Sequence, residues 1–268
     1  MTTPKIDNEP ILIRDVQDGI CLLTLNRPKF LNAMSTEMLT ELQNAFYEIG
    51  DDVAIKVVIL KGNGSIFCSG HDLKEMRSDP SFDTIHDLFL LCSRMMVTMN
   101  NLPQPIIGQA HGIATAAGCQ LLVNCDLAFA SEEARFATPG VTNGLFCSTP
   151  AVALTRNISH KHAMEMLLMG ELFDSEDAVR FGLINKAVPF DQLESTVMKY
   201  AESIASRSSL TIAIGKKSFY PQLSMELEDA YAHASRIMAE NMQERDAIEG
   251  IDAFLEKRQP VWQGRQKN

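Results

Sequence analysis

The segment from Gly108 to Pro150 reads GQAHGIATAAGCQLLVNCDLAFASEEARFATPGVTNGLFCSTP and decides how the rest of the chain is interpreted. Small residues form a turn, an apolar run follows, and a second loop rich in Gly, Thr and Pro closes the segment. The pattern predicts a helix over 118–124 and a strand over 126–130. A turn, a helix and a loop in this order build the floor of a pocket, so we expect the functional site here.

Strand-like and helical patterns alternate along the first half of the chain. Two strand patterns flank Asp18-Gly19, a buried strand is expected over 55–61, and a long helix is expected over 82–102. Repeated strand–helix units of this kind predict an α/β layered fold. From about residue 148 helical patterns dominate, and they cover 149–158, 160–169, 175–181, 190–206, 224–240 and 244–258.

Composition excludes several classes of function. The 268 residues carry a net charge of −10 at pH 7, which argues against an extended nucleic-acid surface. No uninterrupted apolar run reaches the length that spans a membrane, and the opening MTTPKIDNEP resembles neither a signal nor a transit peptide. We therefore expect a cytoplasmic protein with no membrane partner.

The cysteine pattern points to packing rather than to metal or redox chemistry. None of the six cysteines forms a CxxC pair, and several lie in apolar runs, which favours buried, reduced thiols. His160 and His162 begin an expected helix without Cys or carboxylate partners at ligand spacing, so we expect no metal site.

Two backbone corners carry the chemistry that the sequence offers. His71 follows the tight Ser69-Gly70 turn and can direct its N–H into a cavity. The small residues from Ala114 to Gly118 do the same at the start of a helix, where N–H groups lack intrahelical partners. Two converging N–H groups make an oxyanion hole, and each stabilises a developing oxyanion by roughly 2.7–4 kcal/mol.

Five segments, in this order and spacing, resemble the crotonase (enoyl-CoA hydratase/isomerase) superfamily over roughly residues 10–262. They are FCSGHDLKEM, IIGQAHGIATAAGCQLLVNCDLAFAS, ARFATPGVTNGL, GLINKAV and EGIDAFLEKRQPVW. The resemblance implies a crotonase-like ββα spiral core over 1–200 and a C-terminal helical trimerisation region over 201–268. It further implies a homotrimer or a dimer of trimers.

The resemblance also implies an acyl-CoA ligand and a role in fatty acid metabolism. The thioester oxygen would lie between the backbone N–H groups of His71 and Ala117, and the residues bordering CoA would be Leu73 and Lys74. Contacts to the CoA phosphates would come from Lys216 or Lys217, together with Phe219, because a Lys charge suits a phosphate. No cofactor is expected to be bound permanently, since the coenzyme A thioester is itself the substrate or ligand.

The chain departs from the family at the residues that move protons. Family hydratases carry two Glu side chains, and the matching positions here are Gln120 and Gly140. A third acid or base position, used by some family isomerases, is Ser148. Gln cannot accept a proton at neutral pH and Gly has no side chain. Because general acid–base help is worth roughly 10²–10⁴-fold, we expect hydration to be weak or absent.

Several polar groups remain as replacements for the missing carboxylates. Cys147 is favoured as a packing thiol, His111 as a structural residue, and Asp72 as an acceptor that holds the His71 corner. The other polar residues near the second loop and the expected helix are Thr138, Thr142, Asn143, Thr149 and Asn124. Two further functions stay open: a non-catalytic acyl-CoA-binding or assembly protein, and a thioesterase or decarboxylase of the same fold.

Overall fold

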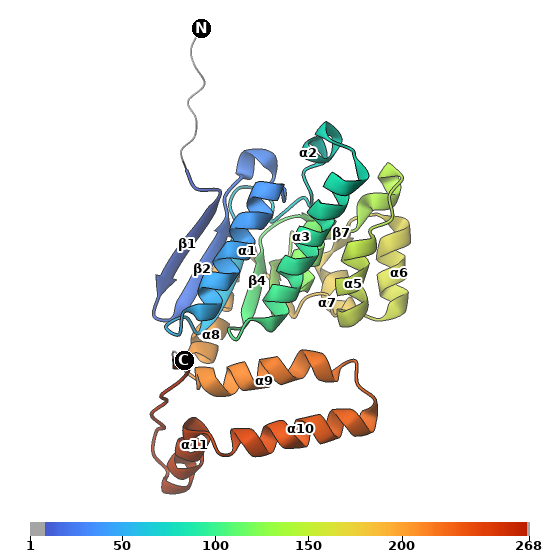
Figure 1. Ribbon diagram of the computed structural model, residues 1–268. Coiled ribbons are helices and arrows are strands. Elements are labelled where there is room, and N and C mark those ends of the chain that lie inside the picture. Colours follow the sequence, from blue (N-terminus) through green and yellow to red (C-terminus); the bar gives the residue numbers. More distant parts are fainter. Residues whose placement is uncertain (1–8, 267–268) are drawn as a thin grey trace.

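The computed structural model describes residues 9–266, and a six-stranded sheet forms its centre (Figure 1). The strand order is β1-β2-β3-β4-β6-β9; β1 and β2 are antiparallel, and every other neighbouring pair is parallel. The strands are β1 (Leu12–Gln17), β2 (Ile20–Leu25), β3 (Val57–Gly62), β4 (Ile106–Ala110), β6 (Leu127–Ser131) and β9 (Lys186–Val188). The predicted α/β layered fold is therefore confirmed.

A second, smaller sheet of three strands explains why the chain winds as a spiral. It consists of β5 (Ala114–Thr115), β7 (Arg135–Ala137) and β8 (Phe173–Asp174). The chain places β4 in the large sheet, β5 in the small one and then a helix, and it repeats this order with β6, β7 and the next helix. This β-β-α repeat matches the predicted ββα spiral core.

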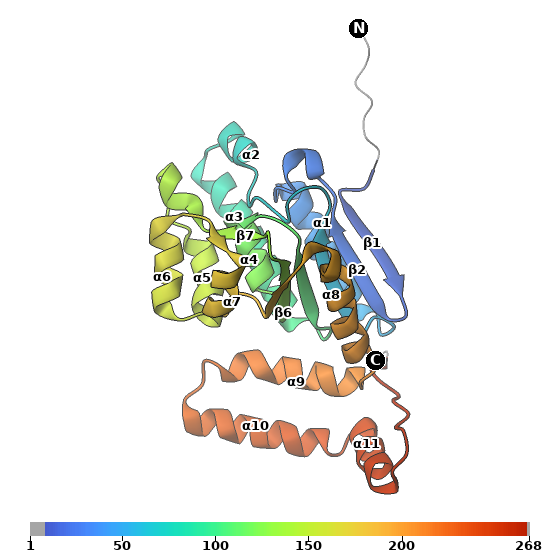
Figure 2. The ribbon, with the colours of Figure 1, turned by 180° about the vertical axis from the view of Figure 1, so that it is seen from behind.

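Helices cover both faces of the large sheet (Figures 1 and 2). On one face lie α1 (Thr36–Asp51) and α3 (Phe82–Asn101), whose apolar sides are buried in the main core. Ser35 caps the start of α1, because its side chain accepts a hydrogen bond from the Met38 N–H. On the other face, α8 (Phe190–Ala205) packs Leu193, Val197 and Ala201 against the strands.

The core also contains several shorter helical segments. They are a 3₁₀ turn over Pro28–Phe30, α2 (Leu73–Ser78), α4 (Ala117–Val123), a 3₁₀ turn over Pro139–Asn143, α5 (Ser148–Asn157), α6 (His160–Met169) and α7 (Ser175–Phe181). Within residues 9–266 no helix is long and apolar enough to cross a membrane.

Three C-terminal helices form a separate layer beneath the core (Figure 1). They are α9 (Ser209–Gln222), α10 (Leu227–Asn241) and α11 (Arg245–Glu256). The sequence patterns indicate α10 and α11 but not α9, which contains Gly215 and Pro221 and lies between α3 and α10. Because α9 has neighbours on opposite sides, its apolar residues do not follow a single face.

Candidate functional site

The corner before α2 depends on a glycine and on backbone pairing with the loop that precedes α1. Gly70 has φ +94°, a conformation that favours glycine, and its carbonyl accepts a 2.8 Å hydrogen bond from the Met34 N–H. A lone parallel bridge joins Met34 to His71. These contacts fix the direction of the backbone at His71.

The start of α4 forms the second corner. Ala116 precedes the helix at φ +50° and ψ −122°, which is a strained conformation for a residue with a Cβ. Ala117 is the first residue of α4, where the helix itself provides no acceptor for the N–H. A Cβ built on Gly70 would lie only 3.2 Å from the Ala117 nitrogen, so the two corners are in close contact.

Both corners line one pocket of about 640 Å³. His71 and Ala117 lie on its wall, together with Gly140 and Ser148 from the second loop. Among the described residues that line this pocket, Asp72 is the only acidic one. The remaining lining is mostly apolar, as expected for a small-molecule site.

Sequence reasoning missed several residues that line this pocket. Lys29, Phe30 and Leu31 come from the loop after β2, and Leu145 and Phe146 come from the loop before α5. Phe30, Leu31, Leu145 and Phe146 are each about half exposed. Exposed aromatic and aliphatic side chains beside Pro and Gly were the available signal, because loops with such residues often carry binding sites.

The imidazole of His71 is held beside the pocket in a largely buried position. Its Nδ1 lies 3.4 Å from the Met34 carbonyl oxygen, and its ring meets Phe89 edge to face with 5.2 Å between the centroids. Its Nε2 is buried and has no partner among the described residues. Burial lowers the pKa of His71, so the ring is neutral at physiological pH.

Asp72 caps α2, as predicted for this acceptor. Its carboxylate accepts hydrogen bonds from the N–H groups of Lys74 (3.1 Å) and Glu75 (3.3 Å). Leu73 and Lys74, the predicted neighbours of CoA, follow directly and also line the pocket. The only acidic side chain among the lining residues is thus occupied by the helix end.

Of the two positions predicted to match the family's glutamates, Gly140 lines the pocket and Gln120 is absent from its lining. Gln120 sits on α4, 4% exposed, and its Oε1 has no hydrogen-bond partner within the described chain. The Gly140 N–H donates to the Sγ of Cys147 over 3.3 Å. Burial raises the pKa of the Cys147 thiol, so this sulfur stays protonated. The Ser148 hydroxyl donates to the Phe146 carbonyl over 3.3 Å.

Lys216 is absent from the lining of this pocket. The predicted contact between Lys216 and the CoA phosphates is contradicted, because its ammonium group is buried and already paired. Its Nζ is buried beneath α3 and donates to the carbonyls of Met99 and Gln104, both at 3.0 Å, and to Asp126 at 2.6 Å. These acceptors use all three ammonium protons. Lys217 and Phe219 are exposed on α9, where their predicted role remains a prediction.

Comparison with known proteins assigns the family. The protein-family model described as enoyl-CoA hydratase/isomerase matches residues 15–265 of the chain. The chain belongs to the enoyl-CoA hydratase/isomerase family. Mouse enoyl-CoA hydratase domain-containing protein 3, mitochondrial, is 46% identical over 246 residues, which cover 92% of this chain and 82% of the mouse protein.

Solved structures confirm the crotonase fold. An enoyl-CoA hydratase from Mycobacterium smegmatis superposes with a TM-score of 0.93 at 46% identity, covering 95% of this chain and 99% of that one. Human enoyl-CoA hydratase domain-containing protein 3 superposes with a TM-score of 0.92 at 43% identity, covering 94% and 100%. The short sequences ATAAGCQL, FATPGV and GLFCSTP point to this same branch of the family.

The expectation of a cytoplasmic protein is wrong. The mouse, rat and human relatives are all named as mitochondrial proteins, and these names contradict it. The sequence argument relied on the composition of the first ten residues, of which residues 1–8 lie outside the described structure. For metals, the described residues contain no group of three or more His, Cys, Asp or Glu side chains that could hold an ion.

Proposed function

We propose that this chain binds an acyl-CoA with the thioester oxygen between the N–H groups of His71 and Ala117, and that it hydrates enoyl-CoA weakly or not at all. One observation carries the proposal: two backbone corners meet in a pocket where Asp72, the only acidic side chain among the described lining residues, is occupied as a helix cap. Such a pocket can stabilise charge on a carbonyl oxygen, but its lining within residues 9–266 offers no uncapped carboxylate to activate water.

The chemistry that follows is enolate stabilisation without an ordinary base. An N–H pair that holds the thioester oxygen withdraws electron density from the carbonyl and lowers the cost of charge on that oxygen. Hydration further needs a base for water and an acid for the α-carbon, which two carboxylates provide in the family hydratases. Gln120 can orient a water molecule through hydrogen bonds but cannot take its proton.

The second candidate is an acyl-CoA-binding protein without turnover. The capped state of Asp72 and the raised pKa of Cys147 favour it, because the described residues that line the pocket offer neither an uncapped carboxylate nor a thiolate. A thioesterase or decarboxylase remains an outcome of the test, since an oxyanion hole suits both reactions.

The test compares three ligands by calorimetry: a saturated acyl-CoA, the matching CoA thioether without a carbonyl, and free CoA. The proposal predicts that the thioester binds more tightly than the thioether. Mass spectrometry of the same mixtures reports any conversion. Equal affinities for thioester and thioether would contradict the assignment of the carbonyl site.

We also propose that the C-terminal layer mediates assembly into a homotrimer or a dimer of trimers. Large apolar side chains are exposed on all three helices, and contiguous exposed apolar surface often marks an interface. They include Phe219, Leu223, Leu227, Tyr231, Met238, Phe254 and Leu255. Light scattering that gives a monomer mass at micromolar protein concentration would contradict this assembly.

A further inference from the structure

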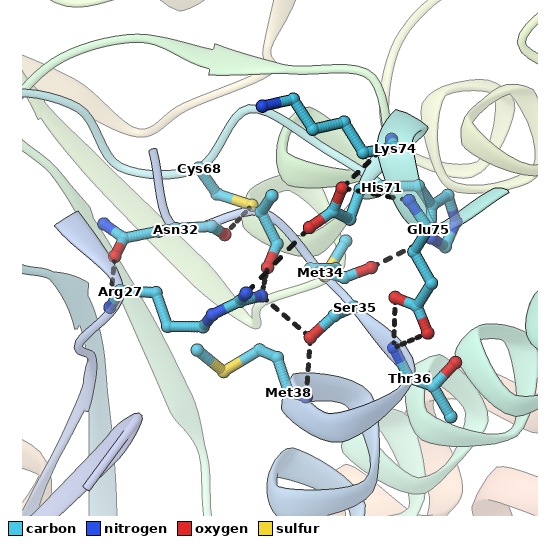
Figure 3. Close-up of polar contacts among 12 residues, drawn as sticks. Arg27, Asn32, Met34, Ser35, Thr36, Met38, Cys68, His71, Lys74 and Glu75 are labelled. Atoms are coloured by element: carbon cyan, nitrogen blue, oxygen red, sulfur yellow. Dashed lines mark hydrogen bonds and ion pairs between the residues drawn. The ribbon is translucent and has the colours of Figure 1, made fainter. Parts of the chain in front are cut away.

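The loop between β2 and α1 is organised around the guanidinium of Arg27 (Figure 3). Its Nη1 donates to the Ser35 hydroxyl at 2.8 Å and to the Ala33 carbonyl at 3.1 Å. Its Cζ also lies 4.8 Å from the centre of the Phe30 ring, in cation–π contact. One side chain therefore holds both ends of a loop that forms one wall of the pocket.

The same guanidinium reaches across to the helix that follows the His71 corner. Its Nη2 lies 3.9 Å from the Asp72 carboxylate, and both side chains are less than one-fifth exposed. Partly buried charges are screened less than surface charges, so the pair retains its attraction. Arg27 thus connects the wall loop to the residue that immediately follows His71.

A second set of hydrogen bonds fixes the same loop to the residues on either side of the Ser69–His71 turn. The buried Asn32, at φ +50°, accepts from the Arg27 backbone N–H at 2.9 Å and donates to the carbonyls of Asn63 and Phe67. Farther along, the Thr36 N–H donates to both oxygens of Glu75, the shorter distance being 3.0 Å. The loop is therefore tied to both flanks of the Ser69–His71 turn (Figure 3).

We infer that Arg27 is a positioning residue for the carbonyl site: it fixes the His71 N–H through Asp72 on one side and through the Ala33–Ser35 backbone on the other. The inference rests on the proposed function. Arg27 is absent from the lining of the pocket, whereas Lys29, Phe30 and Ala33 of its loop belong to that lining. It acts through the corner and not on the ligand.

The shape of the guanidinium explains why lysine cannot replace it. The planar fork bonds Ala33 and Ser35 through one nitrogen while it presents another to Asp72, and a lysine ammonium lacks this geometry. Asp72→Asn provides the complementary change. Asn is a good N-cap, so this variant retains the start of α2 and removes only the charge that faces Arg27.

The test measures the ratio of the affinities for butyryl-CoA and for the matching butyl thioether of CoA. A variant that only loosens the fold weakens both ligands alike and leaves the ratio unchanged. We expect Arg27→Lys and Asp72→Asn each to reduce the ratio by roughly two- to tenfold, the worth of a net hydrogen bond. Arg14→Lys is the matched control, because Arg14 pairs with Glu48 and Asp52 at a site away from the pocket.

Amide hydrogen exchange in the absence of ligand gives a second measurement. Arg27→Lys should speed exchange over residues 69–75 and leave the buried strand β3 unchanged. If the wild-type protein binds butyryl-CoA no more tightly than the thioether, the proposed function is contradicted, and the inference about Arg27 fails with it. A wild-type preference that both Arg27→Lys and Asp72→Asn retain overturns the inference alone. If Arg27→Lys does not fold, the affinity ratio measured for Asp72→Asn alone confirms or overturns the inference.

Discussion

The Gly140 N–H donates a hydrogen bond to the Cys147 Sγ, and this contact closes the loop at a position predicted to match a family glutamate. A Cβ on Gly140 would lie 2.8 Å from that sulfur and 2.6 Å from the Leu145 carbonyl oxygen. Backbone fills the space that a side chain at this position would need. The loop is therefore built around glycine at this position.

Gly140→Ala should lower the free energy of unfolding by about 1–3 kcal/mol, because the added methyl group must displace the loop backbone. Urea denaturation measures the change. Gly50→Ala in α1 is the control, since a Cβ there meets no atom within 4 Å, and its stability should stay equal or rise. An equal change in the free energy of unfolding for the two variants would contradict the prediction, because it would show that the loop accommodates the methyl group without cost.

Ala116→Gly should raise the free energy of unfolding by roughly 1 kcal/mol. Relief of the strain at φ +50° is worth about 1–3 kcal/mol, and the greater freedom of glycine in the unfolded chain offsets about 0.4–1 kcal/mol of it. Ala45→Gly, within α1, should instead cost about 1 kcal/mol. Thermal unfolding of both variants checks the prediction, and destabilisation by Ala116→Gly contradicts it.

Lys216→Met should destabilise the protein by about 3–5 kcal/mol, because it leaves the Asp126 carboxylate without the ammonium it faces at 2.6 Å. Lys217→Met, at the exposed neighbouring position, should change stability by less than about 0.5 kcal/mol. If Lys217 contacts the CoA phosphates as predicted, Lys217→Met weakens CoA binding without altering stability. The two variants together separate the structural lysine from the predicted binding lysine.

Stability should fall as the pH drops below 6.5, in part because of His71 and His111. Burial lowers both pKa values from 6.5, so the unfolded chain binds more protons than the folded one between 6.5 and the folded pKa values. Their stabilising contribution is full above pH 6.5, decreases below it and levels off beneath the folded pKa values. His71→Gln should therefore show a shallower slope than wild type in urea titrations between pH 6.5 and pH 5. An identical slope would contradict the direction assigned to His71.

Local patterns predict the elements that bury one face. The structure confirms the two strands predicted on either side of Asp18-Gly19 and the long helix predicted over 82–102. The helix α9 escapes prediction because it packs between other helices, and β7 and β8 are too short to carry a pattern. Such elements depend on contacts that are distant in the sequence.

The candidate site divides in the same way. The Gly70–His71 corner and the start of α4 follow from small residues at tight turns. The buried position of Lys216 does not follow from the sequence, because its acceptors come from α3, the loop after it and the residue before β6, more than 80 residues earlier in the chain. A lysine in an exposed helix and a lysine beneath one look alike in sequence.

The hydration of crotonyl-CoA at saturating concentration tests the central claim most directly. Loss of the enoyl thioester absorbance reports turnover, and calorimetry on the same sample reports binding. We predict binding with turnover absent or lower than that of an ordinary family hydratase by roughly 10²-fold or more, the value of general acid–base help. Turnover comparable to that of a family hydratase, lost in Gln120→Ala, would contradict the account.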